Sequence, residues 1–165
     1  VFALNPHARN MSDEEMKALA AKGGVIQIVA FDEYLKPLDP EKKKARGMLA
    51  KSLGFTSLDA IFEADKATKK KFFDGLAELD KKWPRADVSL LVDHIDYAVK
   101  LIGVSHVGIA SDFQGGGGIA GWADASETSN VTKELVKRGY SDGDIAAIWG
   151  GNLMRVMDEV AAARR

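Results

Sequence analysis

An acid at the end of an apolar run, followed by four glycines, is the part of this sequence best suited to chemistry. The run 106–111 is short, apolar and bounded by turn residues, which is typical of a buried strand. Asp112 ends it, and in α/β sheets and barrels a carboxylate at the carboxyl end of a parallel strand lies where such folds bind ligands. The glycines at 115–118 let the backbone turn sharply and approach a ligand. An ordinary strand-to-loop exit with a capping aspartate would give the same pattern.

Two other chemistries find less support in the sequence. The three histidines, His7, His94 and His106, fall on a predicted loop, a helix and a strand start, without the spacing of metal ligands. His94 lies beside the apolar stripe of its helix and is predicted to be structural. The glycines could bind phosphate with a following helix N-terminus. However, no lysine follows them, and the next helix begins several residues later.

Capping signals predict the helices around these residues. Ser12 and Glu15 form a capping box that opens a helix ended by the glycine pair at 23–24, and Asp39-Pro40 opens another that runs to about Leu53. The remaining predicted helices are one starting at Thr56 or Ser57, one through Phe72 and Leu79 that stops at Trp83-Pro84, one over 88–102, one over about 130–138, one over 141–148, and a last one capped by Asn152. Residues 122–129 are predicted to be a polar connection, and the lysine runs 42–44 and 69–71 to be solvated helix faces.

Only two strands are predicted, over 25–30 and 106–111, and a long, mostly helical crossover joins them. Such a crossover implies that the strands are parallel. Two strands alone cannot make a parallel sheet that is covered on both faces. The sequence therefore leads us to expect neighbouring strands N-terminal to Val1, in a larger α/β protein. A stand-alone helical domain with a β ribbon is the alternative.

The composition excludes several classes of protein. The chain has 165 residues, of which 46% are hydrophobic and 28% charged, with a net charge of −1, as in ordinary globular domains. The 23 lysines and arginines interleave with 24 acids, which does not favour nucleic-acid binding. No apolar run reaches the roughly 20 residues of a membrane span. The chain has no cysteine, so disulfides and cysteine-bound zinc are excluded and the redox compartment stays open.

Several stretches together resemble the membrane dipeptidase (renal dipeptidase-like) family of the amidohydrolase superfamily. They occur in family order and span nearly the whole chain. They are His7-Ala-Arg-Asn-Met-Ser-Asp13, Gly23-Gly-Val-Ile-Gln-Ile28, Val92-Asp-His-Ile-Asp96, Ile102-Gly-Val-Ser-His-Val-Gly108, Ser111-Asp-Phe-Gln-Gly115, Gly139-Tyr-Ser and Gly150-Gly-Asn-Leu-Met-Arg-Val156. The four glycines look like those of bacterial members.

The resemblance implies the C-terminal part of a (β/α)8 TIM-type barrel, with residues 1–165 as a single partial domain. Residues 25–30 look like the seventh strand, 106–111 like the eighth, and the helices after Asn130 like the closing layer. Such proteins hold two zinc ions and hydrolyse dipeptides, often with a D-residue on the C-terminal side. The family's zinc ligands are a His-x-Asp pair on the first strand, a glutamate on the fourth, and histidines on the fifth and sixth. None maps inside this chain, and the sixth-strand histidine is expected just before Val1.

Two functional positions do map onto the chain. Arg9 is similar to the arginine that binds the terminal carboxylate of the substrate, a task suited to its planar, bidentate guanidinium. Asp112 is similar to the eighth-strand aspartate that meets the substrate and moves a proton from the attacking water to the leaving amine. The family usually has Asp-Phe-Asp-Gly here, and this chain has Gln114 in place of the second acid. That change puts substrate preference in doubt more than the chemistry.

The sequence therefore favours a zinc-dependent dipeptidase to which this chain contributes Arg9 and Asp112. The alternative is a non-catalytic binding or scaffold domain of the same fold. The expected partners are a dipeptide substrate and the N-terminal part of the barrel, and a homodimer is compatible with both readings. The bacterial cytoplasm and a periplasmic or secreted location both fit.

Overall fold

The computed structural model describes residues 1–163, apart from the side chain of Leu58. It divides into two compact units, unit 1 with Val1–Pro37 and Ala86–Arg165 and unit 2 with Leu38–Arg85. Unit 1 contains α1 (Asp13–Ala21), β1 (Ile26–Val29), α2 (Asp32–Leu35), α6 (Val88–Ile102), β2 (Val107–Ala110), α7 (Thr128–Lys137), α8 (Asp142–Ala146) and α9 (Asn152–Ala162). Unit 2 contains α3 (Pro40–Ser52), α4 (Leu58–Glu63) and α5 (Lys66–Lys82).

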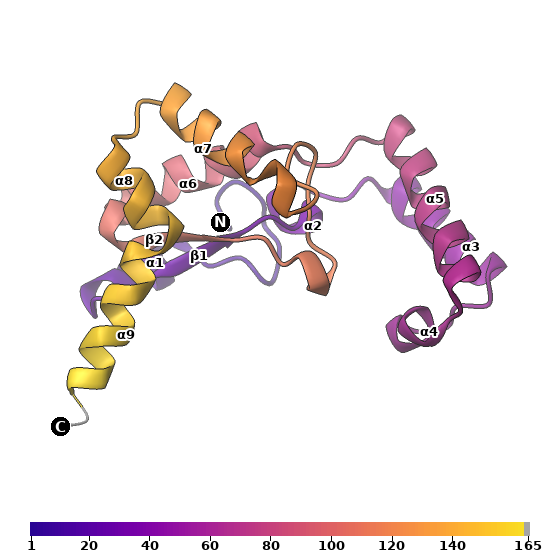
Figure 1. Cartoon of the computed structure of the whole chain (residues 1–165), viewed down its shortest axis with the longest axis horizontal. Helices are drawn as coiled ribbons and strands as arrows, with labels where there is room; N and C mark the ends of the chain where they lie inside the picture. The colour runs from indigo at the N-terminus through magenta and orange to yellow at the C-terminus, as the bar shows by residue number, and fades with distance from the viewer. Residues whose placement is uncertain (164–165) are drawn as a thin grey trace. The chain divides into compact units, whose positions relative to one another are not determined.

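The two strands pair in parallel, as the sequence predicts. Their register aligns Ile26 with Val107 and Val29 with Ala110. Both predicted ranges are slightly longer than the paired segments, and His106 belongs instead to a 3₁₀ turn at Val104–His106. Figure 1 shows β1 and β2 side by side in unit 1, with α6 packed along them. The helical crossover between the strands accounts for the parallel pairing.

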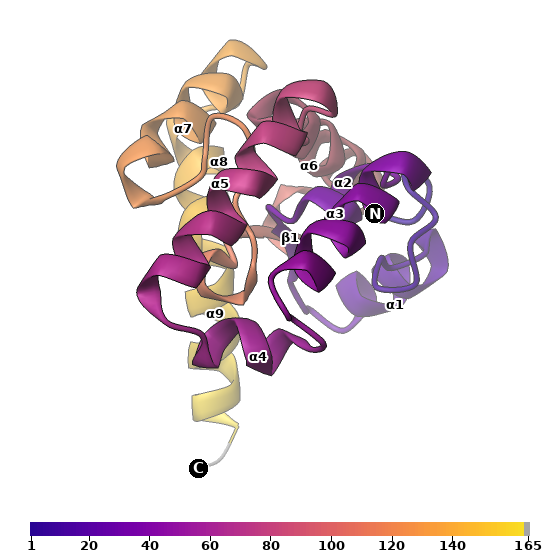
Figure 2. The ribbon, with the colours of Figure 1, turned by 90° about the vertical axis from the view of Figure 1, so that its right-hand side faces the viewer.

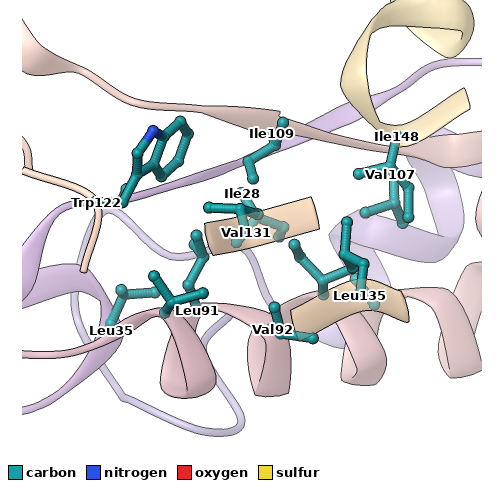
Figure 3. Packing of buried hydrophobic residues seen from close by; sticks show 14 of the residues in the cluster. Ile28, Leu35, Leu91, Val92, Val107, Ile109, Trp122, Val131, Leu135 and Ile148 are labelled. Atoms are coloured by element: carbon teal, nitrogen blue, oxygen red, sulfur yellow. The ribbon is translucent and has the colours of Figure 1, made fainter. Parts of the chain in front are cut away.

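The core of unit 1 lies between the strands and helices α6 and α7. Ile28 and Ile109 face this core from the strands, and Leu91 on α6 is fully buried against it. Figure 3 shows these side chains together with Val131 and Leu135, which α7 contributes. The apolar residues of α6 recur at helical spacing, so one face of the helix is buried. Burial of this face fixes the carboxyl ends of both strands.

Helix starts follow the capping signals closely. Ser12 and Glu15 form the expected capping box, and Asp39 caps α3 ahead of Pro40. The prediction for Asn152 is wrong. Its amide donates to the carbonyls of Val104 (2.7 Å) and Val107 (2.8 Å), so it ties α9 to the start of β2 instead of capping the helix.

Residues 122–129 also differ from the expected polar connection. Trp122 is only 3% exposed and belongs to the core, and its indole N–H donates to Thr128 Oγ1 (3.1 Å). A short 3₁₀ turn at Ala125–Glu127 leads directly into α7, which therefore begins at Thr128 instead of near residue 130. The tertiary contact of one large aromatic residue draws this segment inward.

Unit 2 is built around α3 and α5, which pack side by side (Figure 2). Phe55 and Phe72 meet edge to face, with ring centroids 5.2 Å apart. Lys42 was expected on a solvated face, and this is wrong, because its side chain is 5% exposed and pairs with Asp80 at 2.9 Å. Asp80 also accepts from Arg85 Nε at 2.6 Å. One carboxylate thus neutralises two cations in this unit.

Within unit 1, the chain resumes at Ala86 beside the end of β1. The Ala86 amide donates to the Asp32 carboxylate (2.6 Å), and the Ala86 carbonyl accepts from Ala120 (2.8 Å). The segment after β2 and the start of α6 are therefore held to the same end of the sheet. No helix of the described residues is long and apolar enough to cross a membrane.

Candidate functional site

Asp112 occupies an unusual backbone conformation directly after β2. Its φ of 54° and ψ of 29° lie in the left-handed region, and it is the one non-glycine residue with positive φ in the described part of the chain. Aspartate tolerates this region better than most residues, yet the conformation still has a cost. The side chain is exposed and has no hydrogen bond or ion pair to any described residue. Strain combined with an unengaged carboxylate is typical of a functional position.

The glycines after Asp112 form a closed turn. The amides of Gly115 (2.9 Å) and Gly117 (2.8 Å) both donate to the Asp112 carbonyl, and Gly118 donates to the carbonyl of Ala30 (2.9 Å). Three of the four glycine N–H groups are thus used within the fold. A phosphate cradle needs such groups free and pointing at the ligand. The geometry therefore disfavours the phosphate-binding alternative.

Arg9 lies on the irregular segment that precedes α1. Its guanidinium carbon is 5.9 Å from the centroid of the Tyr34 ring, and its amide donates to His7 Nδ1 (3.1 Å). The His7 ring also meets Tyr34, with centroids 5.0 Å apart. The Arg9 side chain is exposed and has no carboxylate partner in the described part of the chain. A free guanidinium held beside an aromatic ring is available for an anionic ligand.

Two aromatic residues connect the segments that carry Arg9 and Asp112. Phe31 follows β1 and stacks on Tyr34, with ring centroids 4.5 Å apart. On its other side, the Phe31 ring lies 3.6 Å from the position that a Cβ at Gly116 would take. Both segments therefore border residues that follow β1, at the carboxyl edge of the sheet, although Arg9 and Asp112 make no direct contact. Phe31 and Tyr34 were not predicted from the sequence, where the only signal was two aromatic residues just after a buried strand.

Gln114 lies in the 3₁₀ turn Phe113–Gly115 and is exposed. Its neighbour Phe113 packs edge to face on Trp122 (5.5 Å), which in turn packs on Trp149 (5.7 Å). The indole N–H of Trp149 donates to Thr132 Oγ1 (3.0 Å). This aromatic row anchors the turn from inside and leaves position 114 facing solvent. The replaced acid of the family pattern is therefore at a position open to ligands.

The histidines are engaged in the fold. His106 Nδ1 donates to the Gly24 carbonyl (2.8 Å). His94 is fully buried, donates from Nε2 to the Leu35 carbonyl (2.9 Å) and accepts from the Val1 amino group at Nδ1 (2.6 Å). Burial, and then the charge of that amino group, lower the pKa of His94 to about 4. No group of three or more histidine, aspartate or glutamate side chains within the described residues could hold a metal ion.

A groove of about 320 Å³ follows β1 in unit 1. Five consecutive residues, 25–29, line it, together with Leu19, Leu35 and His94. Successive residues of a strand point to opposite faces, so lining by all five places the groove at the edge of the strand. That edge is the one that β2 leaves open in the described sheet. Unpaired backbone groups and apolar walls at this edge suit a further strand.

Comparison with known proteins assigns a family to this arrangement. The chain is 30% identical over 165 residues to dipeptidase aclJ of Aspergillus oryzae, and the alignment covers 99% of this chain and 29% of that protein. It is 44% identical over 159 residues to dipeptidase ataJ of Aspergillus terreus, covering 96% of this chain and 28% of that protein. The chain thus spans less than a third of the length of these relatives.

A solved structure shows the same likeness. The probable dipeptidase PvdM from Pseudomonas aeruginosa superposes with a TM-score of 0.68 at 41% identity, over 93% of this chain and 41% of that one. The family model for membrane dipeptidases, peptidase family M19, matches residues 1–165. The stretches around Arg9 and Asp112 that resemble this family are therefore part of a match that covers the whole sequence. This chain belongs to the membrane dipeptidase family.

Proposed function

We propose that this chain is the C-terminal part of a zinc-dependent dipeptidase with a (β/α)8 barrel, and that residues 1–165 form one partial domain of it. Three observations support the barrel. The two strands are parallel, a helical crossover joins them, and the open edge of β1 borders an apolar groove. Strands of a closed barrel have no open edge, so the groove fits the place of a preceding strand. The whole-chain family match carries the proposal of peptide hydrolysis.

In this proposal Arg9 binds the terminal carboxylate of a dipeptide. Its guanidinium is exposed and rests beside Tyr34, which limits its freedom before substrate arrives. A planar fork of donors pairs with both oxygens of a carboxylate. Recognition of that group distinguishes a dipeptide from a longer peptide, whose carboxylate lies further from the scissile bond. Arg9 is therefore a binding residue that acts throughout the reaction.

Asp112 acts on the protons of the reaction. Its carboxylate accepts a proton from the water that attacks the peptide carbonyl, and it delivers that proton to the amine nitrogen as the C–N bond breaks. The absence of a competing cation or hydrogen-bond donor around its side chain, among the described residues, leaves both oxygens available. General acid–base catalysis of this kind contributes about 10²–10⁴ to a rate.

The family resemblance implies that bound zinc would activate the attacking water. The residues described here do not fit a zinc site by themselves, because they bring no three suitable ligands together. The ligands must then come from parts of the protein outside this chain. This chain itself therefore contributes substrate binding and proton transfer.

The test is hydrolysis by the complete protein that contains this chain, loaded with zinc. We expect release of free amino acids from dipeptides, including dipeptides with a D-residue on the C-terminal side, and much less from the corresponding C-terminal amides. Asp112→Asn is expected to lower the rate of release about 10²-fold or more without changing the zinc content. Binding of dipeptides without any hydrolysis by the zinc-loaded wild type would contradict the proposal and favour a non-catalytic domain of the same fold.

A further inference from the structure

The glycines after Asp112 differ from one another in what they require. Gly116 and Gly118 have φ of 94° and 102°, so a side chain there would be strained in any surroundings. Gly115 and Gly117 lie outside the left-handed region, and Gly115 belongs to the 3₁₀ turn Phe113–Gly115, a conformation that alanine adopts. What keeps these two positions small is the space around them. The reason for each glycine is therefore conformational at two positions and steric at the other two.

The steric limit at Gly115 is the carboxylate of Asp112 itself. A Cβ at Gly115 would lie 2.8 Å from Cγ and 3.0 Å from Oδ2 of Asp112, and would overlap Oδ1. Such distances are far inside van der Waals contact. At Gly117 the overlap is instead with the backbone, at the Ser111 carbonyl and the Asp112 carbonyl. Of these two glycines, only Gly115 would carry a Cβ that meets the side chain of Asp112.

No other described group holds this carboxylate. It accepts no hydrogen bond from its own turn and pairs with no cation there. Its position then depends on the left-handed backbone of Asp112 and on the empty space over Gly115. The backbone is fixed by the bonds from Gly115 and Gly117 to the Asp112 carbonyl. On that backbone, the carboxylate occupies the space over Gly115, which a side chain at 115 would fill.

From this we infer that Gly115 is a positioning residue, which keeps the Asp112 carboxylate in its working place by leaving that space empty. The inference rests on the proposed role of Asp112 in dipeptide hydrolysis. A methyl group at 115 pushes aside the end of a side chain that is free to rotate, so the fold tolerates it. The carboxylate moves away from the reacting atoms, and displacements of about 1 Å can cost a rate about 10²-fold.

The test compares Gly115→Ala with Gly116→Ala in the complete, zinc-loaded protein. For Gly115→Ala we expect kcat to fall about 10- to 100-fold, with KM and the melting temperature close to wild type. For Gly116→Ala we expect the opposite pattern, a lower melting temperature from the strained φ with kcat largely kept. A Gly115→Ala variant that melts normally and keeps full kcat would overturn the inference.

A double-mutant cycle separates this inference from the proposed function. If Gly115 acts through Asp112, adding Gly115→Ala to Asp112→Asn should cause little further loss of kcat. An equal fold-loss in both backgrounds would show that Gly115 acts independently and would refute the positioning role. Full activity of Asp112→Asn alone would instead refute the role of Asp112, and with it the proposed mechanism. The three outcomes are distinct.

Discussion

The two units of this chain use aspartate in opposite ways. In unit 1, Asp112 is exposed, sits on a strained backbone and has no described partner. In unit 2, Asp80 is bound by two cations, at 2.9 Å from Lys42 and 2.6 Å from Arg85, and Lys42 is nearly buried. A carboxylate that is already paired stabilises its surroundings and is poorly available for other chemistry. A carboxylate without a partner, on a backbone conformation that costs stability, is available for proton transfer.

The two units also differ in their content of charged residues and in their secondary structure. Unit 2 contains 12 of the 23 lysines and arginines but only 8 of the 24 acids, and its described elements are all helices. Unit 1 has both strands, the apolar core between them and α6, and both proposed site residues. Family membership covers both units, yet the residues we assign to the reaction come from unit 1 alone. Substitutions in the two units should therefore separate catalysis from stability.

The largest effect is expected for Asp112→Asn in the complete protein. Asparagine keeps the shape of the side chain but cannot carry the proton, so kcat should fall about 10²-fold or more. Asp74→Asn is the matched control, because Asp74 is an exposed acid of unit 2 in a surface pair with Lys70 (2.6 Å). The control should keep full kcat, as measured by release of amino acids. Equal losses in the two variants would remove the distinction between the units.

Arg9→Ala should produce a change in KM. In its proposed role the arginine binds the substrate carboxylate equally in the ground and transition states, so its loss is expected to raise KM with little change in kcat. The expected cost is about 2–3 kcal/mol, as for a hydrogen-bonded charge pair. Steady-state kinetics on acid and amide forms of the same dipeptide measure it, and Arg9→Lys should recover only part of the affinity. The same loss on acids and amides would show that Arg9 does not bind the carboxylate.

Asp80→Asn should lower stability and leave the chemistry intact. It removes the negative charge that faces Lys42 and Arg85. Because Lys42 is buried, the free energy of unfolding is expected to fall by about 2 kcal/mol. Urea unfolding monitored by circular dichroism should show a lower midpoint, while kcat per folded molecule stays at the wild-type value. A strong fall in kcat at unchanged stability would place Asp80 in the machinery of the reaction.

The smallest effect concerns pH and His94. Its pKa is about 4 in the fold, against an ordinary value of 6.5, so below pH 6.5 the unfolded chain binds a proton that the folded chain does not. The free energy of unfolding therefore decreases as the pH is lowered through this range, by about 1.5 kcal/mol from pH 6.5 to pH 5.

Urea unfolding of wild type and His94→Gln at both pH values measures this. The glutamine variant should be less stable at pH 7 but should lose less stability between pH 6.5 and pH 5, since it has no group that titrates there. The Val1 amino group, whose pKa burial lowers to about 6, contacts His94 Nδ1 at 2.6 Å, so part of the difference between the two proteins comes from this amino group. An identical loss in both proteins would show that His94 does not account for the pH dependence.

Elements with local signals could be predicted from the sequence. Ser12 and Asp39 cap their helices as predicted, and Ser57, one of the two predicted starts, caps a third, because a capping side chain bonds to amides two or three residues away. The two strands and their parallel pairing followed from short apolar runs joined by a helical crossover. The family resemblance, on stretches spread along the chain, agrees with the match over its whole length.

Which polar residues are buried, and which glycines are needed, depends instead on tertiary packing. Lys42, His94 and Asn152 all lie inside, because partners distant in sequence satisfy them: Asp80, the Leu35 carbonyl, and the carbonyls of Val104 and Val107. The contact of Phe31 with the glycine turn and the space over Gly115 likewise depend on how β1 and the segment after β2 meet. Such contacts have no local signature, since they arise when separate segments pack against each other.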